Sequence, residues 1–151
     1  MFIMTLAEQI SVDLRTAMKA GEVTRLATLR LLVAQITNQK IALKNDSLSD
    51  EECVKIVQRE IKKRKEAAEG FLKGGRAADA EREGQEQKIL EAYMPAQMSD
   101  EELEKFVREF MTGETGSAIN GGKMIGAILG KLKGKVDGGR VKQMVEKILK
   151  P

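Results

Sequence analysis

The chain has 151 residues, of which 42% are hydrophobic and 32% charged, a composition typical of one folded domain or two small ones and not of a disordered chain. Its 26 basic and 23 acidic residues give a net charge of +3, which by itself favours no class of partner. The absence of histidine and the presence of one cysteine exclude Ser–His and Cys–His catalysis, histidine-ligated metal sites and intrachain disulfides.

The N-terminus shows no pattern of a targeting segment. Residues 1–4 are too few for the apolar region of a secretory signal, and the acidic residues Glu8 and Asp13 follow closely. Either Met1 or Met4 can be the true start. No window of the chain approaches the ~18 uninterrupted apolar residues of a membrane span. We therefore expect a cytoplasmic protein with no membrane segment.

The first two helices are predicted from apolar residues that recur every three or four positions. The first is expected over residues 6–20 and ends near Gly21. The second is expected over residues 22–43, with a buried seam that includes Leu29 and Ile36.

The third helix begins at a predicted capping box, in which the hydroxyl of Ser49 accepts from a backbone N–H while Glu52 reaches back to the N–H of Ser49. It ends at Gly74. The fourth helix is expected over residues 77–94, and Pro95 closes it because the residue before a proline is pushed out of the helical region. Residues up to Pro95 are thus predicted to form a four-helix bundle.

A domain boundary is predicted after Pro95, with domains over residues 1–95 and 96–151. Ser99 and Glu102 form a second predicted capping box, which opens the fifth helix. Residues 112–122 look like a loop and residues 134–139 like a linker, and they separate the fifth, sixth and seventh helices. We therefore predict an all-α fold, in which a four-helix bundle is followed by a smaller three-helix module.

The net charge of +3 hides an asymmetric C-terminal region. Residues 113–151 hold eight basic and three acidic side chains, a net charge of +5. Such a region can attract phosphates, because each neutralised phosphate releases counterions. It can equally be the solvated lysine-rich face of a small helical module. A second basic run, residues 62–65, fans around a helix and is interpreted as a solvated face or, alternatively, a basic targeting run.

Glycines recur every four residues near the sixth helix and would leave a bare strip of backbone on one face. Each interior glycine lowers helix stability by about 0.5–1 kcal/mol relative to alanine. We therefore expect the glycines to serve a structural or functional purpose. The strip either lets another helix approach closely or lets a phosphate backbone approach beside Lys123 and Lys131. The residues of this close-approach set, with the linker glycine at its end, are Gly122, Gly126, Gly130, Gly134 and Gly138.

No set of residues in the sequence combines a nucleophile, a base and an orienting group. Cys53 is interpreted as a core residue, since neighbouring acidic residues oppose a lowered thiol pKa. The acidic runs 50–52 and 100–102 are explained by helix capping better than by metal binding. We therefore expect no catalytic site, no metal and no cofactor.

Five segments taken together resemble the GatB/YqeY family, in particular its stand-alone YqeY-like members. They are residues 29–32, 58–66, 89–95, 98–103 and 123–138. The resemblance covers nearly the whole chain in order and implies an all-helical protein. Larger relatives are B subunits of tRNA-dependent amidotransferases, carbon–nitrogen ligases that use glutamine as amide donor, and their tail domain is similar to residues 99–151.

The resemblance implies a tRNA-contact role without the ligase chemistry, because the catalytic cradle of those enzymes has no counterpart here. By match to the glycine- and lysine-rich segment, the implied nucleic-acid contacts are Lys123, Lys131, Lys133, Lys135, Arg140 and Lys142. The implied partners are tRNA and a protein of the aminoacyl-tRNA or amidotransferase machinery, and we take the chain to be a monomer.

Two other functions stay open at the level of the sequence. One is a protein-interaction adaptor that docks a partner helix on the strip formed by Gly122, Gly126 and Gly130. The other is a component of a glutamine-dependent carbon–nitrogen ligase.

Overall fold

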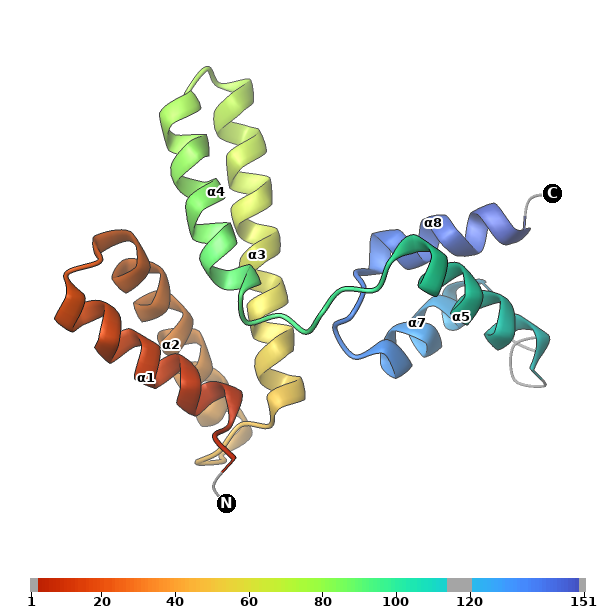
Figure 1. Ribbon diagram of the computed structural model, residues 1–151, viewed down its shortest axis with the longest axis horizontal. Helices are drawn as coiled ribbons and strands as arrows, with labels where there is room; N and C mark the ends of the chain where they lie inside the picture. The colour runs from red at the N-terminus through yellow and green to blue at the C-terminus, as the bar shows by residue number, and fades with distance from the viewer. Residues whose placement is uncertain (1–2, 114–120, 150–151) are drawn as a thin grey trace. The chain divides into compact units, whose positions relative to one another are not determined.

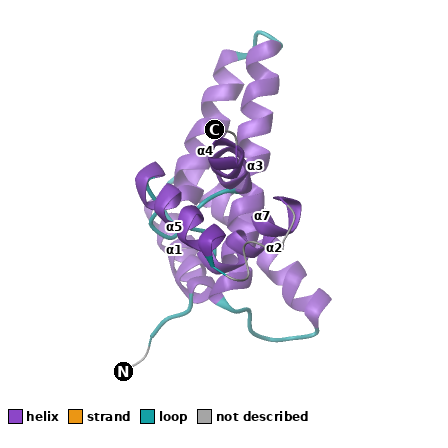
Figure 2. Ribbon diagram, turned by 90° about the vertical axis from the view of Figure 1, so that its right-hand side faces the viewer, coloured by secondary structure: helices purple, strands orange, loops and turns teal. Residues whose placement is uncertain are grey.

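The computed structural model describes residues 3–113 and 121–149, and within them every regular element is an α-helix (Figure 2). This confirms the predicted all-α class. The chain divides into two compact units, Met1–Met94 and Pro95–Pro151. Among the described helices, none is both long and apolar enough to cross a membrane.

Two helical hairpins make up the first unit: α1 (Leu6–Ala20) with α2 (Val23–Leu43), and α3 (Asp50–Lys73) with α4 (Ala77–Glu91) (Figure 1). Their shared core is aliphatic. Its fully buried large side chains include Ile10, Leu29, Leu32, Val57 and Leu90.

Local capping explains where α1 and α3 begin. The predicted box at Ser49 and Glu52 is confirmed, with both the side-chain and the backbone bond formed. A similar box at Thr5 opens α1. The backbone N–H of Leu6 also donates to Asp50 Oδ1 at 2.9 Å, which ties the start of α1 to the start of α3.

The fourth helix is shorter than predicted, since α4 ends at Glu91 and not at Met94. The N–H groups of Tyr93 and Met94 bond to carbonyls three residues back, those of Leu90 and Glu91. The last turn is therefore tightened before Pro95 and is no longer α-helical.

The second unit contains α5 (Asp100–Thr112), α7 (Gly121–Leu132) and α8 (Gly138–Leu149). Its core is mainly aliphatic, and its most deeply buried side chains include Leu103, Val107, Ile128, Val141 and Val145. The predicted capping box at the start of α5 is confirmed.

The ends of three elements in the second unit differ from the sequence prediction. Thr112 still belongs to α5 and Gly121 already belongs to α7, while residues 114–120 of the predicted loop lie outside the described residues. The last helix begins at Gly138, inside the predicted linker. Asp137 Oδ1 accepts from the N–H of Arg140 at 2.9 Å and so caps the start of that helix.

Candidate functional site

The candidate contact residues lie along α7, the turn after it and the start of α8. Residues 121–149 hold seven basic and two acidic side chains, a net charge of +5. Five of the six candidates have exposed side chains: Lys123, Lys131, Lys133, Lys135 and Lys142.

Two of these lysines are placed by specific local structure. The ammonium group of Lys131 lies 5.2 Å from the centre of the Phe110 ring, so α5 supplies an aromatic face that orients this cation. Lys133 has a φ of 43°, in the left-handed region, where the chain leaves α7. Such a backbone conformation is unusual for lysine. The Lys133 side chain therefore does not continue the regular spacing of side chains along α7.

Backbone bonds hold the turn between α7 and α8 against the entry to α5. The N–H of Met98 donates to the carbonyl of Lys135 at 2.9 Å, and Gln97 Nε2 donates to the carbonyl of Gly134 at 3.0 Å. The segment that carries Lys133 and Lys135 is thus attached at two points to residues 97–98. This attachment limits the conformational freedom that a ligand would otherwise have to restrict.

Arg140 is engaged inside the unit through two hydrogen bonds of its side chain. Its guanidinium Nη2 donates to the carbonyl of Met98 at 2.7 Å and to Asp100 Oδ1 at 2.8 Å. Lys147, on the same flank of α8, lies 3.9 Å from Glu104 of α5. Lys142 is about 200° around α8 from Arg140, at 100° per residue. Arg140 therefore joins α8 to α5, and Lys142 lies away from that junction.

The glycine strip is shorter than the sequence predicted. Gly122, Gly126 and Gly130 are exposed on α7, opposite its buried residues. A Cβ atom added at Gly126 or Gly130 would meet nothing within 4 Å. Gly134, with a φ of 82°, lies beyond the end of α7 and does not extend the strip.

Gly138 is not part of the strip either, because it is the first residue of α8 and faces α7. A Cβ atom there would lie 3.5 Å from Leu129 Cδ1, so the close approach is between two helices of this chain. The remaining strip consists of Gly122, Gly126 and Gly130, and Lys123 lies on the same face of α7.

Charge in the second unit is segregated by helix. Residues 100–112, the span of α5, hold five acidic and two basic side chains, in contrast to the basic α7–α8 hairpin. A hydrogen bond from Arg108 and the nearby charge of Lys147 hold the pKa of Glu104 below its usual range. The α5 carboxylates thus neutralise one flank of α8.

Three residues of the basic run 62–65 are exposed, as expected of a solvated face, whereas Arg64 is largely buried. Arg64 is 13% exposed, and its guanidinium lies among three carboxylates: 3.6 Å from Glu60, 3.6 Å from Glu83 and 2.9 Å from Glu86. Burial and the neighbouring Glu86 raise the pKa of Glu83. The Arg64 cluster thus links α3 to α4 and is not available to a partner.

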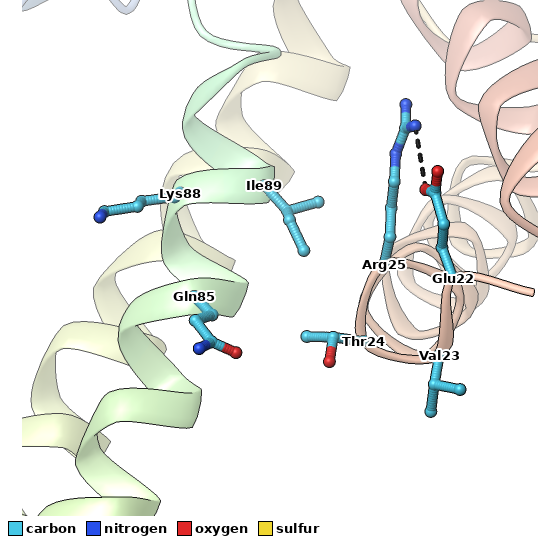
Figure 3. Close-up of a pocket in the computed structure, with 7 residues that line it drawn as sticks. All are labelled: Glu22, Val23, Thr24, Arg25, Gln85, Lys88 and Ile89. Atoms are coloured by element: carbon cyan, nitrogen blue, oxygen red, sulfur yellow. Dashed lines mark hydrogen bonds and ion pairs between the residues drawn. The ribbon is translucent and has the colours of Figure 1, made fainter.

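A shallow hollow lies between α2 and α4 (Figure 3). Thr24 and Ile89 face each other across it, Lys88 points away, and Arg25 bonds to Glu22 at 3.3 Å. Because its charged groups are paired or point outward, the hollow presents no convergent polar set for a small ligand.

Beside the hollow, Tyr93 packs against the core and its hydroxyl is bonded to Asp13, a pair that no local sequence pattern indicates. The Tyr93 hydroxyl donates to Asp13 Oδ2 at 2.6 Å, and Arg25 lies 4.0 Å from the same carboxylate. Burial, followed by the bond to Asp13, raises the pKa of Tyr93 to about 12. The 80-residue separation of the pair left no local signal in the sequence.

Cys53 is fully buried among aliphatic side chains, and burial raises the pKa of its thiol to about 11. A thiol in this state is a poor nucleophile. Within residues 3–113 and 121–149, no group of three or more acidic or cysteine side chains is arranged to hold a metal ion.

Comparison with known proteins matches residues 7–149 to the family model described as Yqey-like protein. A curated relative is "Altered inheritance of mitochondria protein 41, mitochondrial" of Eremothecium gossypii, which is 34% identical over 84 residues. The match covers 56% of this chain and 46% of that relative, so it spans about half of the relative's length.

Proposed function

Because the chain belongs to the YqeY-like family, we propose that it is a non-catalytic tRNA-binding or amidotransferase-associated protein whose α7–α8 hairpin contacts RNA phosphates. The observation that carries this proposal is the set of five exposed lysines on a hairpin of net charge +5. Lysine ammonium groups at such positions would bind the backbone of RNA without reading its sequence.

Three lysines are the centre of the proposed contact. Lys131 is oriented by Phe110, and Lys133 and Lys135 lie in the turn that is attached to residues 97–98. Arg140 is assigned a positioning role, since its guanidinium is bonded to Met98 and Asp100. Lys123 and Lys142 would extend the contact along α7 and onto α8.

A matched pair of charge reversals tests the proposal. The first variant changes Lys131, Lys133 and Lys135 to Glu. The control changes Lys55, Arg59 and Lys62, three exposed cations of α3, to Glu, so that both variants differ from the native protein by the same total charge. We expect tRNA binding, measured by fluorescence anisotropy at fixed salt, to be abolished in the first variant and reduced at most several-fold in the control. Equal losses would show non-specific attraction, and an unchanged affinity of the first variant would remove the site assignment.

A second candidate function is supported by the exposed glycine strip. The open space beside Gly126 and Gly130 would admit the backbone of a partner helix. An adaptor of this kind would bind a protein of the aminoacyl-tRNA or amidotransferase machinery. Gly126→Leu and Gly130→Leu would then remove binding to an amidotransferase subunit and leave tRNA affinity unchanged. Loss of tRNA affinity in these variants would favour the RNA contact instead.

The third candidate, a component of a glutamine-dependent carbon–nitrogen ligase, would act by delivering the charged tRNA. It is tested by adding the protein to an amidotransferase that acts on mischarged tRNA. A faster conversion of the tRNA-bound acid to its amide would support it.

We propose the cytoplasm as the compartment, although the fungal relative is mitochondrial by its name. Fractionation of cells that express a tagged chain tests this assignment.

A further inference from the structure

Helix α2 carries apolar side chains on two opposite faces. Its inner face is packed in the core, through Leu29, Leu32 and Ile36. On the outer face, Leu31 is 52% exposed and Ile41 is 69% exposed. A helix that is apolar all round is usually buried on all sides, so the outer face is unusual for a helix that borders solvent.

The outer face follows the spacing of a helix-pairing seam. Five exposed residues step by four, three, four and three positions; we call them the outer α2 ridge, and they are Ala27, Leu31, Ala34, Asn38 and Ile41. This 3.5-residue period is the one that keeps a seam facing a second helix. The two alanines leave room for close approach, and a single asparagine in such a seam specifies register.

Helix α3 provides an internal comparison, because six of its exposed residues follow the same spacing and all six are charged. They are Lys55, Arg59, Lys62, Glu66, Glu69 and Lys73. The two helices thus share the geometry and differ in chemistry. The ridge of α2 thus carries Leu31 and Ile41 where the corresponding ridge of α3 is charged, and Leu72 is exposed on α3 outside that ridge.

The charges of α2 indicate what chemistry would cover the ridge. Residues 23–43 contain no acidic residue, and of their three basic residues Arg30 lies beside the ridge while Arg25 and Lys40 lie on the opposite side of the helix. Arg30 is exposed directly beside the ridge, and within the described part of the chain it forms no ion pair. A partner that buries the ridge would gain from carboxylates beside its own apolar seam.

We propose that the outer α2 ridge docks an amphipathic helix of a partner protein, with an aliphatic contact face and acidic flanks. A second copy of α2 is the poorer occupant, because two helices with only positive charges would repel each other. An anionic lipid surface is also disfavoured, because the polar amide of Asn38 interrupts the ridge near its middle. The inference concerns the first unit and does not depend on RNA binding by the second.

Two synthetic helices serve as probes of the ridge. Both have leucine and alanine at their contact positions; one has glutamate and the other lysine at the flanking positions. We expect the glutamate peptide to bind the full chain at least tenfold more tightly than the lysine peptide, measured by fluorescence anisotropy. Arg30→Glu should reduce this preference several-fold.

Matched substitutions locate the binding surface. Leu31→Gln should weaken binding of the glutamate peptide about tenfold or more, because a buried leucine contact is lost. Leu72→Gln is the control, since Leu72 is 61% exposed on α3 and away from the ridge. Circular dichroism confirms that both variants keep their helices, as expected for exposed positions.

Several outcomes would overturn the inference. They are binding of neither peptide, equal affinity for the two, or equal loss in the Leu31 and Leu72 variants. Dimerisation of the native chain that Leu31→Gln abolishes would assign the ridge to a second copy. Binding to vesicles of anionic lipid that Leu31→Gln abolishes would assign it to a membrane.

Discussion

The two units of the molecule use their charged residues in different ways. In the first unit, Arg64 lies among three carboxylates and links α3 to α4. In the second unit, acidic residues gather on α5 and basic residues on α7 and α8, and Arg140 and Lys147 pair with carboxylates of α5. Charge thus contributes to packing in the first unit, whereas most of the lysines of the α7–α8 hairpin remain exposed to solvent.

The strongest way to break this comparison is to remove the central charge of the first unit. Arg64→Met would leave the largely buried carboxylates of Glu83 and Glu86 close together without this counter-ion, while Lys63 still pairs with Glu60. We expect the free energy of unfolding to fall by about 3–5 kcal/mol, measured by urea denaturation.

Arg108→Met is the matched control in the second unit. Arg108 pairs with Glu104 of α5 at 2.9 Å, but its side chain is 58% exposed. The expected loss is below about 1 kcal/mol, because exposed ion pairs contribute little. Comparable losses in the two variants would contradict the distinction between the units.

Substitution of two glycines of the second unit by alanine should change the free energy of unfolding in opposite directions. Gly126→Ala should raise the free energy of unfolding by about 0.5–1 kcal/mol, because the position is helical and open. Gly134→Ala should lower it by about 1–2 kcal/mol, because its φ of 82° is unfavourable for alanine. Destabilisation by Gly126→Ala would show that the strip is covered.

A smaller effect is expected at Tyr93 in the first unit. Tyr93→Phe removes the bond to Asp13 and should lower the free energy of unfolding by about 0.5–1.5 kcal/mol.

The same residue gives a pH dependence. The folded state raises the pKa of Tyr93 from 10 to about 12, so its neutral form is favoured by folding. This contribution is fully present below pH 10 and is lost as pH rises from 10 to about 12. Since Tyr93 is the only tyrosine and the chain has no tryptophan, the absorbance of tyrosinate follows its titration directly. A titration midpoint at the ordinary value of 10 in the folded protein would contradict the buried bond.

Local signals in the sequence were sufficient for the presence of the described helices and for the caps at Ser49 and Ser99, but not for every helix end. Ser49 and Ser99 open helices because the hydroxyl and the glutamate three residues later act within one turn. The role of Arg64 could not be predicted, because its partners Glu83 and Glu86 come from another helix. The same holds for Arg140, which bonds to residues about 40 positions earlier.

The glycine strip and the outer α2 ridge show a second limit. The four-residue spacing alone included Gly134, but a change to positive φ at Lys133 ends the helix before it. In α2, apolar residues occur on both faces, and the periodicity of the inner seam does not reveal that Leu31 and Ile41 stay exposed. The assignment of the six candidate residues to an RNA contact remains a prediction. For Arg140, the bonds to Met98 and Asp100 suggest a positioning role instead.

The salt dependence of tRNA binding tests the central claim most directly. The native protein is compared with a variant in which Lys131, Lys133 and Lys135 are changed to Gln, and the logarithm of the association constant is plotted against the logarithm of salt concentration. If these lysines neutralise RNA phosphates, the magnitude of the slope falls by about 2–3 in the variant, at about 0.7–0.9 per contact. An unchanged slope would contradict the account, because the exposed charge of the α7–α8 hairpin would then have no part in binding.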